Sequence, residues 1–279
     1  MTSIDGGKLT RSELSTYWAR LSHEHLTKQD DGLAAICYAG MPAWFNQFLD
    51  VYQRKAMVRL ASGEDFASKR ILDVGTGVGR WARWFEAQAA CDVVGIDIEP
   101  VRLRTAREYG GRTQYFEMPA NHLAFPDNSF DFVNTITVLQ HVDHAVKREA
   151  IAEFNRVLRP GGKAIVFEIT DEGDDASHVY PWPQEAWVTE FEKHQFALMR
   201  TVGDQYIPFL RAMKRAYKLY RGRTARNEID SMKTGDGRSH GLLLPLKLAT
   251  FASYPVEEVA RFLPSRFARI TGFLFEKRA

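Results

Sequence analysis

Two ionisable side chains in this sequence could move a proton in a reaction. His141 follows an apolar run that ends near Thr137, and Glu168 stands near the end of a second run, 163–169. An imidazole titrates near neutral pH and can act as a general base toward a hydroxyl group, while Glu168 could orient or charge-balance it. We predict both as catalytic residues. The alternatives are a histidine that only fixes its loop and a glutamate at a solvated strand end.

A glycine-rich segment offers a binding loop for a polar ligand. Gly75, Gly77 and Gly79 directly follow the apolar run ILDV. Glycine permits a tight turn and the close approach of a ligand, and the start of the next helix offers free N–H groups. A dinucleotide-binding loop, G-x-G-x-x-G, would need a glycine at position 80, where Arg80 stands. Asp73 could instead receive an ammonium group; a turn with purely structural glycines is the alternative.

A further carboxylate, Asp97, ends the next apolar run, 24 residues after Asp73. In that place a carboxylate can accept both hydroxyl groups of a ribose. Asp97 could also cap the helix expected at 100–110, and the two roles are compatible.

The elements that must position these residues alternate between strand-like and helix-like patterns. The expected strands are 71–74, 92–97, 113–118, 130–137 and 163–169. The expected helices between them are 80–90, 100–110 and 144–158. Pro100 marks the start of the second helix, and the turn Pro160-Gly161-Gly162 closes the third. Such alternation predicts βαβ units and a parallel sheet that is covered on both faces.

Further elements are expected on both sides of this core. Helical spacing covers 12–26 and 43–61, and after the acidic loop 171–183 we expect a helix, a strand near 196–203 and a last strand at 267–277. We divide the chain into an N-terminal helical cap (1–67), a core (68–204), an inserted helical lid (205–264) and a final core strand (265–279).

The motifs together resemble one family. Asp73-Val-Gly75-Thr-Gly77-Val-Gly79 resembles the first motif of class I S-adenosylmethionine-dependent methyltransferases, and the likeness continues to Glu168. The segments MPANHLAFPDNSFDFV, NTITVLQHV and LRPGGKAIVFE are similar to those of ubiquinone-biosynthesis-like methyltransferases. The resemblance implies an α/β fold, Rossmann-like and doubly wound, with a mostly parallel seven-stranded sheet. It also implies a methyltransferase that uses S-adenosyl-L-methionine.

The resemblance assigns roles to residues of the cofactor site. Asp73 would serve the methionine end, Asp97 the ribose and Ile98 one face of the adenine. Pro119 stands where such proteins carry an adenine-reading aspartate, so we expect neighbouring groups to replace that contact. The other residues assigned to the cofactor are Gly75, Thr76, Gly77, Ala120, Asn121, Thr135 and Gln140. A pair like His141 and Glu168 occurs in sugar O-methyltransferases of this fold.

The methyl acceptor is expected to lie against aromatic side chains. We assign to it Tyr17, Trp18, Met41, Trp44 and Trp182. A simple packed helix is the alternative for the stretch around Trp44. The stretch 209–223 carries six basic residues from Arg211 to Arg223. We interpret it as an amphipathic lid over the acceptor; contact with an anionic substrate or a nucleic acid is the alternative.

Composition limits the remaining choices. The chain has 279 residues and a formal charge of +2, so no global field favours nucleic acid. Two cysteines, no secretory start and no apolar run near 18 residues predict a cytoplasmic protein without a membrane span. The acids at 171–175 are interpreted as a solvated loop rather than a cation site, and no metal is expected.

We therefore expect a small-molecule methyltransferase, with oxygen as the acceptor atom and a sugar, glycoconjugate or natural product as the acceptor. The alternatives are an N-methyltransferase, an RNA methyltransferase that uses the basic stretch, and a non-catalytic cofactor-binding regulator. The sequence leaves the oligomeric state open, a homodimer included.

Overall fold

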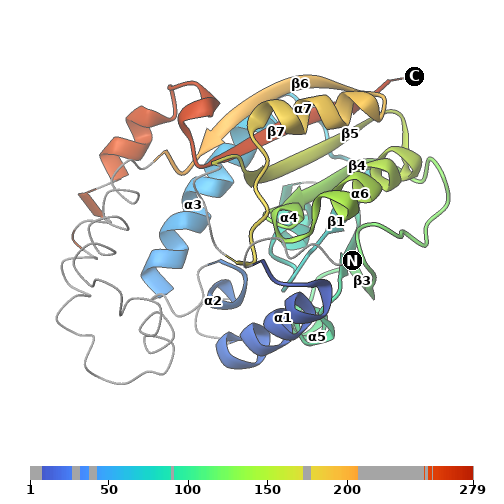
Figure 1. Cartoon of the computed structure of the whole chain (residues 1–279), viewed down its shortest axis with the longest axis horizontal. Coiled ribbons are helices and arrows are strands. Elements are labelled where there is room, and N and C mark those ends of the chain that lie inside the picture. Colours follow the sequence, from blue (N-terminus) through green and yellow to red (C-terminus); the bar gives the residue numbers. More distant parts are fainter. Residues whose placement is uncertain are drawn as a thin grey trace.

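A seven-stranded sheet forms the centre of the computed structural model (Figure 1). The structure describes residues 8–26, 32–37, 43–88, 91–171, 177–206, 248, 251–252 and 254–278. The strands are β1 (Arg70–Val74), β2 (Asp92–Asp97), β3 (Gln114–Glu117), β4 (Phe130–Ile136), β5 (Leu158–Ile169), β6 (Phe196–Asp204) and β7 (Ile270–Lys277). Their order is β3-β2-β1-β4-β5-β7-β6. Every neighbouring pair is parallel up to β5, and β7 is antiparallel to both β5 and β6. The predicted doubly wound, mostly parallel fold is confirmed.

Helices cover both faces of the sheet because successive strand residues point to opposite sides. Ile71 and Val93 face a core built with α3, α4 and α5, whereas Leu72 and Val94 face a core built with α6 and α7. These helices are α3 (Ala43–Leu60), α4 (Arg80–Gln88), α5 (Pro100–Glu108), α6 (His144–Val157) and α7 (Gln184–Lys193). The carboxyl ends of β1, β2, β4 and β5 therefore meet at one edge, which is where open α/β sheets bind ligands.

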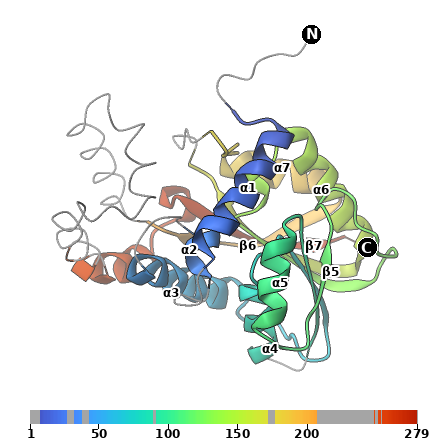
Figure 2. The same ribbon diagram turned by 90° about the horizontal axis from the view of Figure 1, so that it is seen from below.

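Two helices from the N-terminal part of the chain lie over this edge. They are α1 (Arg11–His25), which begins with a capping box at Thr10, and α2 (Leu33–Ile36). Figure 2 shows α2 between α1 and α3, with α1 alongside α5. The side chain of Arg102 on α5 donates to Ser22 on α1 at 2.8 Å and fixes the two helices together.

The structure differs from the sequence prediction in two elements. The helix α2 has four residues, too few for helical periodicity to reveal it. The strand β5 begins at Leu158, directly after α6, and not at position 163. Gly161 adopts a positive φ of 74° inside this strand, and the pairing with β4 shifts register between Phe130 and Phe132. The predicted turn is therefore a bulge within a longer strand.

The chain leaves the sheet after β6 and returns to it at β7. Most of the segment 205–264, which we predicted to be a helical lid, lies outside the described residues. The basic stretch 209–223 belongs to this part. The described part includes residues 254–260, a helical segment, and the turn η4 (Ser265–Phe267). Tyr206 joins both ends, because its N–H donates to Glu257 at 3.0 Å and its hydroxyl donates to the carbonyl of Leu263 at 2.8 Å. Within the described ranges, no helix is long and apolar enough to cross a membrane.

Candidate functional site

The glycine loop after β1 adopts backbone conformations that favour glycine. Gly75, Gly77 and Gly79 have φ values of 65°, 56° and 74°. A Cβ at Gly75 would lie 2.3 Å from Cγ2 of Val138, and a Cβ at Gly79 would lie 2.3 Å from the hydroxyl of Tyr115. The loop is therefore packed closely against its neighbours as well as sharply turned.

Asp73 lies buried beneath this loop, at the end of β1. Its carboxylate accepts from the Thr76 hydroxyl at 2.6 Å and from the side-chain amide of Asn134 at 2.7 Å. Burial raises the pKa of Asp73 to about 6, against the opposing effect of these hydrogen bonds. Each carboxylate oxygen can accept more than one hydrogen bond, so the group retains capacity for an ammonium donor. Asp73 thus braces the loop and adds negative charge beneath it.

Asp97 joins the glycine loop to the end of β2. One of its carboxylate oxygens accepts from the N–H of Gly77 and the other from the N–H of Glu99, both at 2.9 Å. The helix α5 is capped by Glu99, whose side chain accepts from the N–H of Val101. The capping role considered for Asp97 therefore belongs to Glu99. Asp97 itself is 7% exposed, beside the loop it helps to shape.

The residues predicted at the adenine end follow β2 and β3, which are neighbouring strands. The Ile98 side chain is 49% exposed, and the N–H of Met118 donates to the carbonyl of Asp97 at 3.0 Å. Pro119 is exposed and Ala120 half-buried. The side-chain amide of Asn121 donates to Glu149 on α6 at 2.7 Å. Asn121 is thus held by an acidic partner, and its carbonyl oxygen remains as an acceptor.

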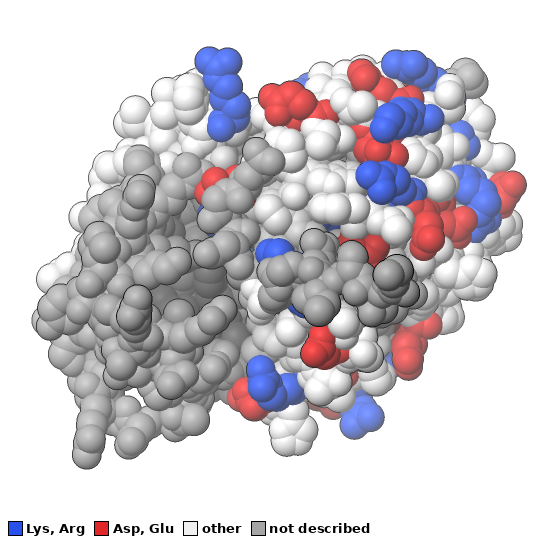
Figure 3. Space-filling view, viewed as in Figure 1, with Lys and Arg blue, Asp and Glu red and all other residues white. Residues whose placement is uncertain are grey.

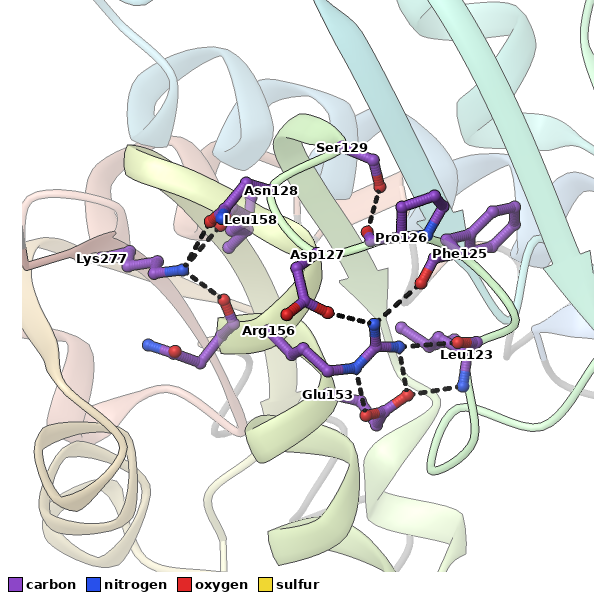
Figure 4. Close-up of polar contacts among 11 residues, drawn as sticks. Leu123, Phe125, Pro126, Asp127, Asn128, Ser129, Glu153, Arg156, Leu158 and Lys277 are labelled. Atoms are coloured by element: carbon purple, nitrogen blue, oxygen red, sulfur yellow. Dashed lines mark hydrogen bonds and ion pairs between the residues drawn. The ribbon is translucent and has the colours of Figure 1, made fainter.

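An arginine on α6 fixes the loop that continues from these residues (Figure 4). The Arg156 guanidinium donates to the carbonyls of Leu123 and Phe125 and to the carboxylates of Asp127 and Glu153, at 2.7–2.8 Å. Glu153 also accepts from the N–H of Leu123 at 2.7 Å. These charge-assisted bonds hold the loop between β3 and β4 in one conformation.

These residues fit S-adenosylmethionine. The two buried carboxylates, Asp73 and Asp97, lie at the ends of adjacent strands beside the glycine turn, where polar groups of a ligand could reach them. Asp73 would hold the ammonium end and Asp97 the ribose. Thr135 lies fully buried on β4 with its hydroxyl unpartnered among the described residues, and it pairs in register with Val74. Its predicted cofactor contact would use that hydroxyl.

His141 sits in a sharp turn after β4, and its hydrogen bonds define its tautomer. Nδ1 lies 2.9 Å from the carbonyl oxygen of His178, which can only accept, so Nδ1 carries the hydrogen. Nε2 lies 3.1 Å from the side-chain nitrogen of Gln140. Because the Gln140 oxygen accepts from the N–H of Ile169, its amide nitrogen must donate to His141. Burial, followed by the neighbouring His178, lowers the pKa of His141 to about 3. The ring is therefore neutral, with its lone pair on Nε2.

Glu168 supports the same turn from the end of β5. Its carboxylate accepts the N–H groups of Val138, Leu139 and Gln140, at 3.2, 2.9 and 2.9 Å. The side chain is fully buried, so the alternative of a solvated strand end is wrong. Thr137, which precedes the turn, has a positive φ of 56°, which reverses the chain sharply after β4. Glu168 thus holds the backbone that carries His141.

Aromatic side chains from α1 surround the His141 ring. The His178 ring stacks on His141 with centroids 5.3 Å apart and on Tyr17 at 4.9 Å, and Trp18 meets the His141 ring edge-on at 4.7 Å. Of the predicted acceptor residues, Trp18 therefore contacts the predicted base directly, and Tyr17 lies against His178, the next ring of the stack. His178 was not predicted, because it stands in an acidic loop without a recognisable motif.

The other predicted acceptor residues lie elsewhere. Trp44 packs at 6.1 Å from Phe45, in a cluster with Phe48 and Tyr254. Trp182 is 7% exposed and packs against Trp187 between α6 and α7. Met41 lies outside the described residues. Among the residues that the structure describes, no group of three or more potential ligands could hold a metal ion.

Comparison with known proteins gives matches in both sequence and structure. Residues 72–166 match the family model described as a methyltransferase domain. The ubiquinone/menaquinone biosynthesis C-methyltransferase of Paraburkholderia phytofirmans is 31% identical over 141 residues, which cover 46% of this chain and 57% of that protein. The demethylmenaquinone methyltransferase of Thermus thermophilus is 36% identical over 124 residues, 43% of this chain and 54% of that protein. The chain thus spans little more than half the length of these relatives.

A solved structure matches almost the whole chain. Phosphoethanolamine N-methyltransferase 2 of Haemonchus contortus, solved in complex with S-adenosyl-L-methionine, has a TM-score of 0.58 and covers 98% of this chain and 61% of its own. At 18% identity the likeness shows the fold alone.

Proposed function

We propose that this chain, which carries a class I S-adenosylmethionine-dependent methyltransferase domain, transfers the methyl group of its cofactor to an oxygen atom of a small molecule. The domain and its cofactor follow from the matched family, from the relatives and from the fold. The oxygen acceptor is our inference from the site. The observation that supports it most is the neutral His141 ring in contact with Trp18.

The residues of this chain would bind the cofactor, orient the acceptor and remove a proton from the acceptor. When bound, S-adenosylmethionine supplies an electrophilic methyl group on a positively charged sulfur. Asp73 would hold its ammonium group and Asp97 its ribose, and Glu168 fixes the turn that carries His141. Methyl transfer is an in-line displacement, so alignment of the acceptor with the methyl group supplies much of the acceleration. Tyr17 and Trp18, the two predicted acceptor residues near the His141 turn, would provide that alignment.

His141 would act as the general base through Nε2. The Gln140 amide now donates to this atom, so an acceptor hydroxyl must take its place. A general base is most effective when its pKa lies near the working pH, so the lowered pKa of His141 weakens it as a base and suits it only to a hydroxyl that is itself acidic. Among the acceptors expected from the sequence, a natural product with a phenolic or enolic hydroxyl is therefore favoured over a sugar.

The experiment is a methyl-transfer assay with labelled cofactor and four acceptor classes: phenols, sugars, small amines and RNA. We expect label on phenolic oxygen, identified by mass spectrometry of the product. Label on sugars or amines alone would reject the acidic-hydroxyl proposal. The absence of transfer to any acceptor in these classes and in cell extracts would favour a non-catalytic regulator.

Carbon methylation is the second candidate, because two relatives are named for quinone biosynthesis and one of them as a C-methyltransferase. Deprotonation of a phenol also makes its ring carbons nucleophilic, so the same base would serve both reactions. The position of the label in the product distinguishes the two.

RNA methylation has less support. On the face drawn in Figure 3, Lys and Arg side chains alternate with Asp and Glu, as expected from the charge of +2. Nucleic-acid binding relies on a concentrated positive surface and weakens steeply with salt. A complex with RNA that weakens as the salt concentration rises would support RNA methylation. We propose a cytoplasmic location from the two cysteines of the sequence.

A further inference from the structure

Three aromatic rings stand in one column beside the proposed base. The His178 ring lies between those of Tyr17 and His141, with ring centroids 4.9 and 5.3 Å away and interplanar angles of 21° and 22°. Trp18 meets both histidine rings edge-on, with centroids 4.7 Å from His141 and 6.1 Å from His178. Stacked and edge-to-face pairs stabilise aromatic rings beyond the effect of their buried area. The column therefore restrains the plane of the His141 ring.

His178 also contacts His141 through its backbone. Its carbonyl oxygen lies 2.9 Å from Nδ1 of His141, and a carbonyl can only accept a hydrogen bond. His178 thus acts both on the plane of the imidazole and on the nitrogen that carries its hydrogen. With Nδ1 occupied in this way, the nitrogen that the ring can offer to an acceptor hydroxyl is Nε2.

The loop that carries His178 is bound on two sides. On one side, the N–H of Leu9 donates to the carbonyl of Ser177 at 3.0 Å, and the hydroxyl of Tyr180 donates to the carbonyl of Leu9 at 2.5 Å. On the other side, the N–H of Tyr180 donates to the carbonyl of Gln140 at 2.7 Å. Hydrogen bonds therefore join the N-terminal segment, this loop and the turn after β4.

We propose that His178, clamped by Tyr17, is a positioning residue that holds the His141 ring in one plane with its hydrogen on Nδ1. The inference rests on the proposed function, in which His141 is the general base. The family model matches residues 72–166, and neither His178 nor Tyr17 lies in that range. The orientation of the base therefore depends on segments outside the matched domain.

The ring contact and the hydrogen bond depend on each other, because both need the loop in one position. Loss of the His178 ring removes its stacking on Tyr17 and on His141, and it lets the carbonyl move away from Nδ1. The hydrogen on Nδ1 then exchanges with water more readily. Because Gln140 donates to Nε2 and favours the same tautomer, faster exchange is the expected change. This exchange can be measured without knowledge of the acceptor.

The experiment compares His178→Ala, which removes the ring, with His178→Phe, which keeps a ring that can stack. His144→Ala is the matched control, because the His144 ring stacks on Trp182 at 5.5 Å and 20° and not on His141. The readout is solvent exchange of the Nδ1 hydrogen of His141, by NMR of protein with isotope-labelled histidine. Calorimetry with S-adenosylhomocysteine, the product of the cofactor, reports on the cofactor site. Tyr17→Leu and the double variant Tyr17→Leu/His178→Ala complete a cycle.

For His178→Ala we expect the Nδ1 hydrogen of His141 to exchange about two- to tenfold faster than in the wild type, the factor that a lost stacked pair implies. His178→Phe and His144→Ala should exchange like the wild type. Tyr17→Leu should accelerate exchange in the wild-type background and add nothing to His178→Ala. The affinity for S-adenosylhomocysteine should stay unchanged in all these variants.

Unchanged exchange in His178→Ala would overturn the proposal. Equal acceleration in His178→Phe would also overturn it, because the effect would then belong to the nitrogen atoms of the imidazole and not to the stack. Equal acceleration in His144→Ala, or a matching loss of S-adenosylhomocysteine affinity, would indicate a general disturbance of the sheet edge and count against it equally. These readouts do not require turnover, so failure to find an acceptor would count only against the proposed function.

Discussion

At the scale of single residues, Gln140 explains how the His141 ring is fixed in one orientation. Its backbone N–H binds Glu168, its backbone carbonyl accepts from Tyr180, and its side chain joins the N–H of Ile169 to the His141 ring. One side chain therefore fixes both the rotamer and the tautomer of His141. A sequence motif names such a residue but does not reveal which atom faces which partner.

Replacement of His141 tests the base directly. We expect His141→Ala to lower kcat for oxygen transfer by roughly 10²–10⁴-fold, because general-base catalysis contributes about that factor. The affinity for S-adenosylhomocysteine should change little. Single-turnover kinetics at saturating cofactor measure the chemical step. Activity within about threefold of the wild type, against that expected range, would remove His141 as the base.

Asp73 should make cofactor binding depend on pH. Its pKa is raised to about 6, so the carboxyl is charged above that pH and neutral below it. Since the charged form attracts the ammonium group, affinity for S-adenosylhomocysteine should fall as pH drops through about 6. Asp73→Asn should bind more weakly at pH 8 and lose this dependence, as measured by calorimetry. The same pH dependence in the variant would show that another group titrates.

The residues of the cofactor loop were predictable because the loop requires particular amino acids at a particular spacing. Three glycines with positive φ and two acids at strand ends leave a readable pattern. His178 leaves none, because its role depends on contacts between distant segments. The burial of Glu168 could not be read either, since a glutamate at a strand end is usually solvated.

At the scale of elements, the loop between β3 and β4 depends on α6 for its shape. Arg156→Met takes away the bonds to the carbonyls of Leu123 and Phe125 and leaves the mostly buried carboxylate of Glu153 without its charged partner. We expect roughly tenfold weaker S-adenosylhomocysteine binding, because bonds to charged groups contribute about 1.5–3 kcal/mol and this site is partly exposed.

Arg148→Met is the matched control for that variant. Arg148 lies on the same helix and pairs with Glu190 at 3.5 Å, away from the loop. The Arg148→Met variant should bind S-adenosylhomocysteine as tightly as the wild type does. Equal loss of affinity in the two variants would mean that α6 as a whole is destabilised.

The strands and helices of the core were predictable from the spacing of apolar residues in the sequence. The short helix and the bulge that depart from this regular pattern were not. Buried parallel strands such as β2 and β5 read as continuous apolar runs. The helix α2 and the bulge at Gly161 depend instead on tertiary packing, which a local pattern does not contain.

At the scale of the whole molecule, two buried carboxyl groups stand where β6 meets the returning chain. Asp204 is 2% exposed, and neither of its oxygens meets hydrogen-bond geometry with a described residue. Burial, followed by the charge of Glu257, raises the pKa of Asp204 to about 7, while Gln205, Arg59 and Arg80 oppose the rise. The pKa of Glu257 is also raised by burial.

These groups should make stability depend on pH. A carboxyl whose folded pKa is raised favours the folded state while it is protonated, and this contribution is lost as pH rises from the unfolded value, near 4, to about 7. Asp204→Asn should therefore raise Tm at pH 8 by about 3 °C or more relative to the wild type, with no gain near pH 4. Differential scanning fluorimetry measures Tm at both pH values. An equal loss of Tm at the two pH values would contradict the assignment.

The junction between β6 and β7 indicates where homologous chains can differ in length and sequence without a change in the core. The excursion after Asp204 begins and ends on neighbouring strands at the far side of the sheet from β2 and β3, and Tyr206 binds its return segment directly. Insertions, deletions or a foreign segment in this excursion would leave the register of β1 to β5 intact. Homologous chains could then exchange this excursion by recombination at the junction, while the strands that carry the cofactor loop are inherited unchanged.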